Sequence, residues 1–179
     1  MIRSFFLFTF FIFVIPLLPA QSSLKNWEGL WKGKMTAENF TSPPSEVDVM
    51  LEIVPMGENR WSWKTTYSEN IQLGIPAVIK DYHMVMIDST RTPFHLEEDD
   101  GFIIYFSWVQ NQLIGSFLID SEEGTFAYHA QYEMNDPQEL IFTLTGHRLP
   151  EEKRVFGEMQ PIFIQTTRFT SVKEWNKKN

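Results

Sequence analysis

Aromatic side chains are the residues of this chain whose type and spacing most clearly suggest a chemical role. The 179 residues include 16 Phe, 6 Trp and 5 Tyr, and many of them occupy every second position of short apolar segments. Aromatic rings bury large apolar areas, and Tyr and Trp add a polar group that can orient a bound molecule. They serve either as ligand contacts or simply as core. The set assigned to one inner face comprises Trp61, Trp63, Tyr67, Phe102, Phe106, Trp108, Phe117, Phe126, Tyr128, Tyr132 and Phe142.

Arg168 is the basic residue of the last apolar segment and joins this set as a candidate ligand contact. An inward guanidinium cannot stay unpaired, so it would meet a carboxylate, stack on Trp31 or wait for an acidic ligand. Pro161 lies upstream in the same segment, and a register shift of one residue would turn Arg168 out to solvent. From the sequence alone, both orientations remain open.

Other reactive groups are few. The four histidines are His83, His95, His129 and His147, and no two have the spacing of metal ligands. A haem barrel with a single axial ligand at His147 is a minor alternative that no second feature supports. Without cysteine there are no thiolate sites, and no nucleophile elbow or phosphate loop occurs. We therefore predict no catalytic residues, no metal and no cofactor.

The N-terminus has the pattern of a secretion signal. Arg3 precedes a Phe-rich apolar run over 5–18, and small Ala20 suits cleavage before Gln21. A retained membrane anchor is the alternative, but a span needs about 20 apolar residues, and Pro16 interrupts this shorter run. We expect a signal peptide at 1–20, export to the periplasm or exterior, and one domain at 21–179 with no membrane span after cleavage.

The charge balance narrows the partners. Loss of Arg3 leaves 14 Lys and Arg against 23 Asp and Glu, a net charge of −9. No basic cluster occurs, so nucleic acid and anionic lipid are not expected partners. The acidic excess serves solubility.

Apolar residues recur with period two, which is typical of half-buried strands rather than helices. Segment 46–53 alternates Val, Val, Leu and Ile with polar residues, whereas 77–87 alternates poorly and its facing stays ambiguous. Short turns with Asp, Asn and Gly join the segments, which favours an antiparallel meander. The ten expected strands are 27–36, 46–53, 60–67, 77–87, 94–97, 102–109, 113–120, 125–134, 139–149 and one within 160–170.

Closure of this meander into a barrel would remove its two exposed edges, although two packed sheets would fit the same pattern. Ten strands enclose more space than side chains alone usually fill, so we expect an interior cavity. The Pro- and Ser-rich stretch 41–45 is expected to be a loop at the barrel mouth.

Gly29-Leu30-Trp31 on the first strand resembles the Gly-x-Trp signature of the lipocalins, within the calycin group of up-and-down barrels. The resemblance implies an all-β, calycin-like barrel that holds a small apolar molecule, with Gly29 and Trp31 as structural residues at the closed end. No Thr-Asp-Tyr-like loop and no long helix follow. Ten strands look more like the fatty-acid-binding branch, whose Arg-x-Tyr grips a carboxylate, but here the stretch reads Arg168-Phe169-Thr170.

Two functions from different classes follow from these patterns. The first is an exported, lipocalin-like protein that binds a small hydrophobic ligand. The second is an interaction or inhibitor module that uses a filled barrel to present its loops to a protein partner. A third function, an enzyme that uses interior Tyr, His and carboxylates, is the least favoured, because a fold alone implies no chemistry and no catalytic constellation is visible in the sequence.

Overall fold

The described part of the chain forms ten strands and one short helix. The computed structural model describes residues 24–39, 42–69, 74, 76–87, 93–99, 101–149 and 161–172. The expected signal peptide at 1–20 lies outside the described residues. The elements are the 3-10 helix η1 (Lys25–Trp27) and the strands β1 (Gly29–Asn39), β2 (Ser42–Gly57), β3 (Arg60–Tyr67), β4 (Val78–Met86), β5 (Pro93–Glu98), β6 (Ile103–Val109), β7 (Gln112–Ser121), β8 (Gly124–Asp136), β9 (Glu139–Arg148) and β10 (Pro161–Ser171).

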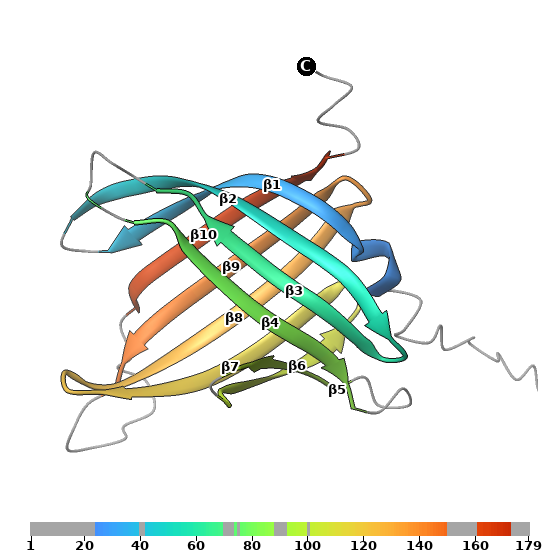
Figure 1. The fold of residues 1–179 in the computed structure, drawn as a ribbon. Coiled ribbons are helices and arrows are strands. Elements are labelled where there is room, and N and C mark those ends of the chain that lie inside the picture. The colour runs from blue at the N-terminus through green and yellow to red at the C-terminus, as the bar shows by residue number, and fades with distance from the viewer. Residues whose placement is uncertain are drawn as a thin grey trace, which may run out of the picture.

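The strands close into one antiparallel barrel (Figure 1). Each strand pairs with the strand before it in the sequence, and β1 also pairs with β10 to complete the circle. Closure pairs both edges of every described strand, which removes the exposed edges of an open meander. The prediction of an all-β, ten-stranded, closed up-and-down meander is confirmed, and the alternative of two packed sheets is not observed.

Alternation along the strands separates an apolar interior from a polar exterior. Every second residue from Val47 to Ile53 is buried, and the residues between them face out. Trp61 and Trp63 are buried in the same way on the neighbouring strand β3. The period-two pattern thus predicts the correct facing, because one face of each strand lies against the core and the other lies against water.

Closure of the barrel depends on a close approach between its first and last strands. At Gly33 in β1, an added methyl carbon would overlap the backbone oxygen of Arg168 in β10 and lie 2.8 Å from the carbonyl carbon of the same residue. No side chain larger than hydrogen fits there without a shift of one strand. Gly29, at the start of β1, has a φ of +135°, which L side chains rarely adopt. Gly29 therefore permits an unusual backbone angle, whereas Gly33 permits the close approach of β1 and β10.

The structure corrects two sequence expectations at strand ends and resolves one facing that the sequence left open. The sequence pattern predicts strand from Trp27, but η1 occupies Lys25–Trp27 and β1 begins at Gly29. The expected loop at 41–45 is mostly strand, since β2 begins at Ser42. The ambiguous segment 77–87 has its inward face at Met84 and Met86, which are both buried.

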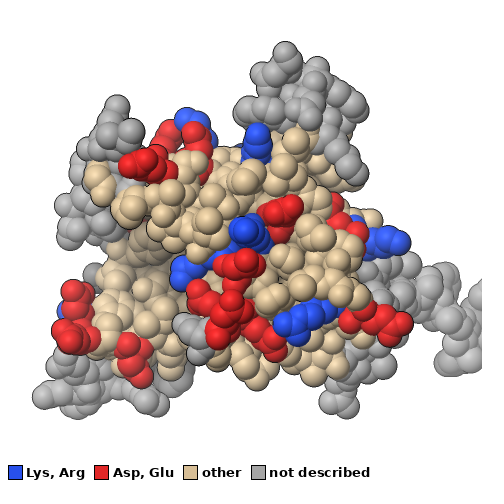
Figure 2. All heavy atoms as spheres, in the orientation of Figure 1, with Lys and Arg blue, Asp and Glu red and all other residues tan. Residues whose placement is uncertain are grey.

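Charged side chains of both signs mix on the outside of the barrel. Figure 2 shows acidic and basic groups interspersed on the face formed by β2, β3 and β4. Two ion pairs on the outer surface are Lys34 with Glu46, at 3.5 Å, and Arg60 with Glu97, at 3.3 Å. Such exposed pairs stabilise the fold only slightly.

Candidate ligand-binding site

One end of the barrel is closed by η1 and the residue before it. Leu24 and Trp27 are both almost completely buried. The Trp27 ring lies 5.2 Å from that of Trp108 and 6.2 Å from that of Trp63, measured between ring centroids. The indole nitrogen of Trp31 donates a hydrogen bond of 2.8 Å to the backbone oxygen of Trp27. Trp31 is thus buried as expected at the closed end, but Trp27 is the ring that enters the interior.

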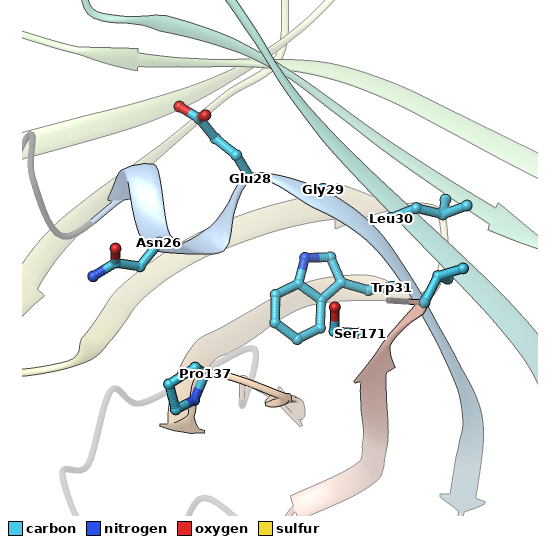
Figure 3. A pocket seen from close by; sticks show the side chains of 8 residues that line it. Asn26, Glu28, Gly29, Leu30, Trp31, Pro137 and Ser171 are labelled. Atoms are coloured by element: carbon cyan, nitrogen blue, oxygen red, sulfur yellow. The ribbon is translucent and has the colours of Figure 1, made fainter. Parts of the chain in front are cut away.

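A pocket of about 300 Å³ lies at this closed end (Figure 3). Its lining consists of Asn26, Glu28, Gly29, Leu30, Trp31, Pro137, Ser171 and Val172. In Figure 3 the Glu28 carboxylate points away from the Trp31 ring, and it accepts a 3.0 Å hydrogen bond from the Trp61 indole. None of the predicted ligand-contacting aromatics lines this pocket.

The next level of the barrel is an aromatic core centred on Tyr132. Its ring lies 5.1 Å from Trp63, 6.2 Å from Phe106 and 4.4 Å from Phe142. The Trp63 indole donates a 3.3 Å hydrogen bond to the Tyr132 hydroxyl. Burial raises the pKa of Tyr132 well above its ordinary value. Trp61, Trp63, Phe106 and Tyr132 are buried and serve as core.

A second aromatic group lies toward the end of the barrel away from η1. Phe117 and Tyr128 stack with their ring centroids 5.2 Å apart, and Phe102 meets Phe117 edge-on at 5.7 Å. Tyr67 ends β3 at this same side of the barrel. The predicted set is therefore divided between a packed core level and this level, where the four side chains are only partly buried.

Inward-facing side chains between these two levels retain exposed area. Phe142 pairs with Tyr132 on one side and with Thr167 on the other, and Leu144 pairs with Ala130 and Gln165. Both β9 residues are only partly buried although their strand neighbours are buried. Both side chains point inward and pack against the buried core. This level of the interior is therefore less completely buried than the level around Trp63.

Polar side chains from β10 border the same space. Gln165 is 7% exposed and Thr167 is 1% exposed, and they alternate with the exposed Arg168. Neither the Gln165 amide nitrogen nor the Thr167 hydroxyl oxygen has a hydrogen-bond partner among the described residues. The Gln165 side chain neighbours the Tyr67 hydroxyl, whose pKa is raised by burial against the lowering effects of Gln165 and Lys80.

Sequence reasoning missed Gln165 and Thr167. The available signal was their alternation in step with Phe169, which is fully buried on the same face of β10. Phe169 is the apolar residue that marks this face of β10 as the inner one. Two polar residues in a row at inward positions instead resemble the outer face of a strand.

Two charged side chains also occupy inward-facing positions. Lys80 pairs in register with the buried Thr65, and Glu98 pairs with Tyr82. The Lys80 amine lies 3.0 Å from the Glu98 carboxylate, and both are partly exposed. The rim of the barrel thus carries an internally neutralised pair, which the sequence did not predict.

The structure contradicts the prediction that Arg168 contacts a ligand inside the barrel. Its side chain is 65% exposed and its guanidinium lies 3.0 Å from the Glu139 carboxylate on the outer surface. Asn135 and Arg168 hold the pKa of Glu139 below its usual value. In the register of β9 and β10, Arg168 pairs with Ile141, and the pairing shifts between Pro161 and Phe163. Arg168 therefore cannot grip a ligand inside the barrel.

The alternative of a haem held by His147 also fails, because the His147 side chain faces outward. Gly146 faces inward, where an added carbon would meet the Tyr128 ring at 2.9 Å, so the next residue, His147, faces outward. It borders a surface depression of about 390 Å³ lined by Ser116, Phe117, Leu118, Ala127, Tyr128, His129 and His147. A haem inside the barrel cannot use His147 as its ligand. Within the described ranges, no group of three or more acidic or histidine side chains could hold a metal ion.

In the part of the chain that the structure describes, no helix is both long and apolar enough to cross a bilayer.

Comparison with solved structures places this barrel among known ones. The S-type phycobiliprotein lyase CPES from Guillardia theta matches with a TM-score of 0.61 at 8% identity, over 87% of this chain and 93% of that chain. Rv2717c from M. tuberculosis matches with a TM-score of 0.56 at 13% identity, over 87% and 98%. A Nostoc punctiforme protein of unknown function from the DUF3598 family gives 0.57 at 9%, over 83% and 48%.

No protein-family model matches the chain, and no curated protein sequence does. Identities this low show a shared fold alone. The topology and these comparisons together define a closed, ten-stranded antiparallel barrel that is structurally similar to these proteins. The resemblance suggested by Gly29 and Trp31 is supported at this coarser level.

Proposed function

We propose that this protein is a lipocalin-like binding protein for a small, mostly apolar molecule, which it holds in the barrel between the aromatic core and the end away from η1. The observation that carries the proposal is the partly exposed inner surface at Phe142 and Leu144, bordered by the buried polar atoms of Gln165 and Thr167. Apolar pockets with a few placed polar groups are the usual form of small-molecule sites.

The rest of the interior supports this location. Trp27 and the rings around Tyr132 fill the η1 end, so a guest has room only on their far side. Among the predicted contacts, Tyr67, Phe117, Tyr128 and Phe142 line that side, whereas Trp61, Trp63, Phe106 and Trp108 form its floor or lie below it. A phycobiliprotein lyase among the structural neighbours is compatible with a barrel that handles a small organic molecule.

Titration with N-phenyl-naphthylamine, a neutral apolar fluorescent probe, tests the proposal. We expect one probe per chain and quenching of tryptophan emission, because Trp63 lies in the floor of the site. Leu144→Trp places a large side chain inside the barrel and should weaken binding by about tenfold or more, as expected for loss of more than about 1.4 kcal/mol. Leu118→Trp, on the exposed outer face of β7, is the matched control and should bind like the unmodified protein.

Failure of the unmodified protein to bind any apolar probe would contradict the proposal and favour the interaction module. Equal binding by Leu144→Trp, with loss in Leu118→Trp, would move the site to the outer depression beside His147. Both results overturn interior binding.

We further propose export of the protein, with removal of 1–20. The support is the sequence pattern that ends at Ala20. Expression of the full chain in a bacterium, followed by fractionation and N-terminal sequencing, should give a periplasmic or secreted chain that starts at Gln21. A chain retained in the cytoplasm with Met1 still present would contradict this.

A further inference from the structure

Two buried polar groups inside the barrel lack partners among the described residues. The Gln165 amide nitrogen and the Thr167 hydroxyl lie two residues apart on the inner face of β10, and neither has a hydrogen-bond partner of good geometry among the described residues. The Gln165 side chain lies close enough to the Tyr67 hydroxyl to lower the pKa of that group. Their neighbours across the strand pairs are Leu144 and Phe142, which offer no polar side-chain atom. Buried polar groups without partners are costly and rare in native proteins. Such a pair beside the partly buried Phe142 and Leu144 indicates that a bound molecule supplies the partner.

Both groups can donate a hydrogen bond. An amide nitrogen carries only donors, and a hydroxyl can donate in a direction set by its partner. The Tyr67 hydroxyl lies beside Gln165 and is a third neutral group at the same place. The site therefore calls for a hydrogen-bond acceptor.

The basic residues that the structure describes near these donors are already engaged. Lys80, whose charge reaches Tyr67, is bonded to Glu98 at 3.0 Å. Arg148, at the end of β9, is exposed and bonds to the backbone oxygen of Glu123. Arg168 lies outside the barrel on Glu139. A carboxylate brought to Gln165 and Thr167 would lose its hydration without gaining a cation, which is far more costly than burial of a neutral acceptor.

We propose that the ligand presents an uncharged carbonyl oxygen to Gln165 and Thr167, with its apolar remainder against Phe142 and Leu144. The ligand class is accordingly a ketone, ester or amide with an apolar body rather than a free fatty acid. The inference rests on the proposed function, since it names the chemistry of the molecule bound in the same space.

Three chain-matched competitors test this with the full chain and N-phenyl-naphthylamine as the displaced probe. They are a long-chain methyl ketone, the alkane of equal carbon count and the fatty acid of equal carbon count. We expect the ketone to displace the probe at a concentration about tenfold lower than the alkane, since one or two hydrogen bonds to otherwise unpaired groups separate them. The fatty acid, above its own pKa, should compete less well than the ketone.

Variants on β10 assign the preference to its residues. Gln165→Leu and Thr167→Val each remove one donor with little change in volume, so the ketone should lose most of its advantage while the alkane binds as before. Thr167→Ser keeps the hydroxyl and should keep the advantage. Thr166→Val, the same substitution at the adjacent position of β10, should change neither competitor. Gln165→Leu and Thr167→Val are independent, so failure of one to fold leaves the other as the test.

The outcomes separate this inference from the proposed function. Equal displacement by ketone and alkane, or strongest displacement by the fatty acid, would overturn the carbonyl site while interior binding stands. An unchanged ketone advantage in both Gln165→Leu and Thr167→Val would overturn it as well. If the probe itself does not bind, the proposed function fails, and this inference fails with it.

Discussion

At the scale of single residues, Trp31 combines burial with a polar anchor. Its ring is 2% exposed and its indole nitrogen donates to the backbone oxygen of Trp27. This hydrogen bond connects β1 to η1, so the Trp31 side chain helps to hold η1 at the closed end of the barrel.

Substitution of Trp31 should therefore cost stability. We expect Trp31→Ala to lower the free energy of unfolding by about 3–5 kcal/mol, as for other large-to-small core changes. Trp31→Phe keeps most of the bulk and loses the hydrogen bond, so its loss should be smaller, about 1–3 kcal/mol. Chemical denaturation measures both. A loss below about 1 kcal/mol for Trp31→Ala would show that the ring contributes no more than a surface residue.

Substitution of Thr167, unlike that of Trp31, should not lower the free energy of unfolding. In the absence of ligand, its buried hydroxyl has no partner in the described structure, so Thr167→Val should leave the unfolding free energy unchanged or raise it by about 1 kcal/mol. Thr166→Val corrects for the strand preference of valine. If Thr167→Val unfolds more easily than Thr166→Val by more than about 1 kcal/mol, the hydroxyl has a partner in the unliganded protein.

The buried tyrosines give a stability that depends on alkaline pH. Burial raises the pKa of Tyr67 and of Tyr132, so between the unfolded value of about 10 and the folded value, the native state holds more protons than the unfolded chain. The unfolding free energy should then fall as pH rises above about 10.

Urea denaturation at a series of pH values measures this effect. Tyr132→Phe lowers stability at neutral pH, because it leaves the Trp63 indole without its acceptor, but it should also flatten the alkaline decline. Tyr105→Phe, at an exposed ring on β6, is the control and should leave the decline unchanged. If the unfolding free energy falls with pH at the same slope in the unmodified protein and in Tyr132→Phe, the decline does not come from Tyr132.

At the scale of elements, the seam between β1 and β10 is the most constrained contact. Gly33→Ala would place a carbon on the Arg168 backbone oxygen, and a strand cannot yield as a side chain can. We expect a loss of about 1–3 kcal/mol or more in thermal or chemical unfolding. Gly146→Ala is the matched control, because there the obstacle at 2.9 Å is an atom of the Tyr128 ring. A smaller loss at Gly33 than at Gly146 would contradict this view of the seam.

The elements also show what the sequence could and could not predict. The period-two pattern predicted strands such as β2, because one face of each lies against the core and the other lies against water along its buried length. The helix η1 was missed because three residues are too few to show a helical period. The facing of 77–87 stayed ambiguous because Val78 and Ile79 are both exposed at the rim of the barrel, where alternation carries no burial signal.

For the candidate site, the sequence predicted the rings but not the polar groups. Tyr67, Phe117, Tyr128 and Phe142 were identified because aromatics at alternate positions indicate an inner face. Gln165 and Thr167 were not identified, since polar residues resemble an outer face unless the register is known. Arg168 was assigned to the interior as one of two possible orientations, and the structure places it in the other, paired with Glu139 on the outer surface.

At the scale of the whole molecule, the barrel has two unequal ends. Leu24, Trp27 and Trp31 fill the end at η1, while Phe142 and Leu144 are only partly buried. A filled end with a less completely buried level above it suits the proposed binding of a small molecule. The mixed charges outside offer no single-sign surface for an anionic polymer on the face shown in Figure 2.

The central claim is that an apolar guest binds inside the barrel, and methyl NMR tests it most directly. The protein would be labelled at the methyl groups of leucine and threonine and titrated with N-phenyl-naphthylamine. We predict that the largest shifts occur at the inward methyls of Leu144 and Thr167, with Leu118 and Thr166 on the outer face little changed. Shifts confined to Leu118 and Thr166, with Leu144 and Thr167 unmoved at saturation, would contradict interior binding.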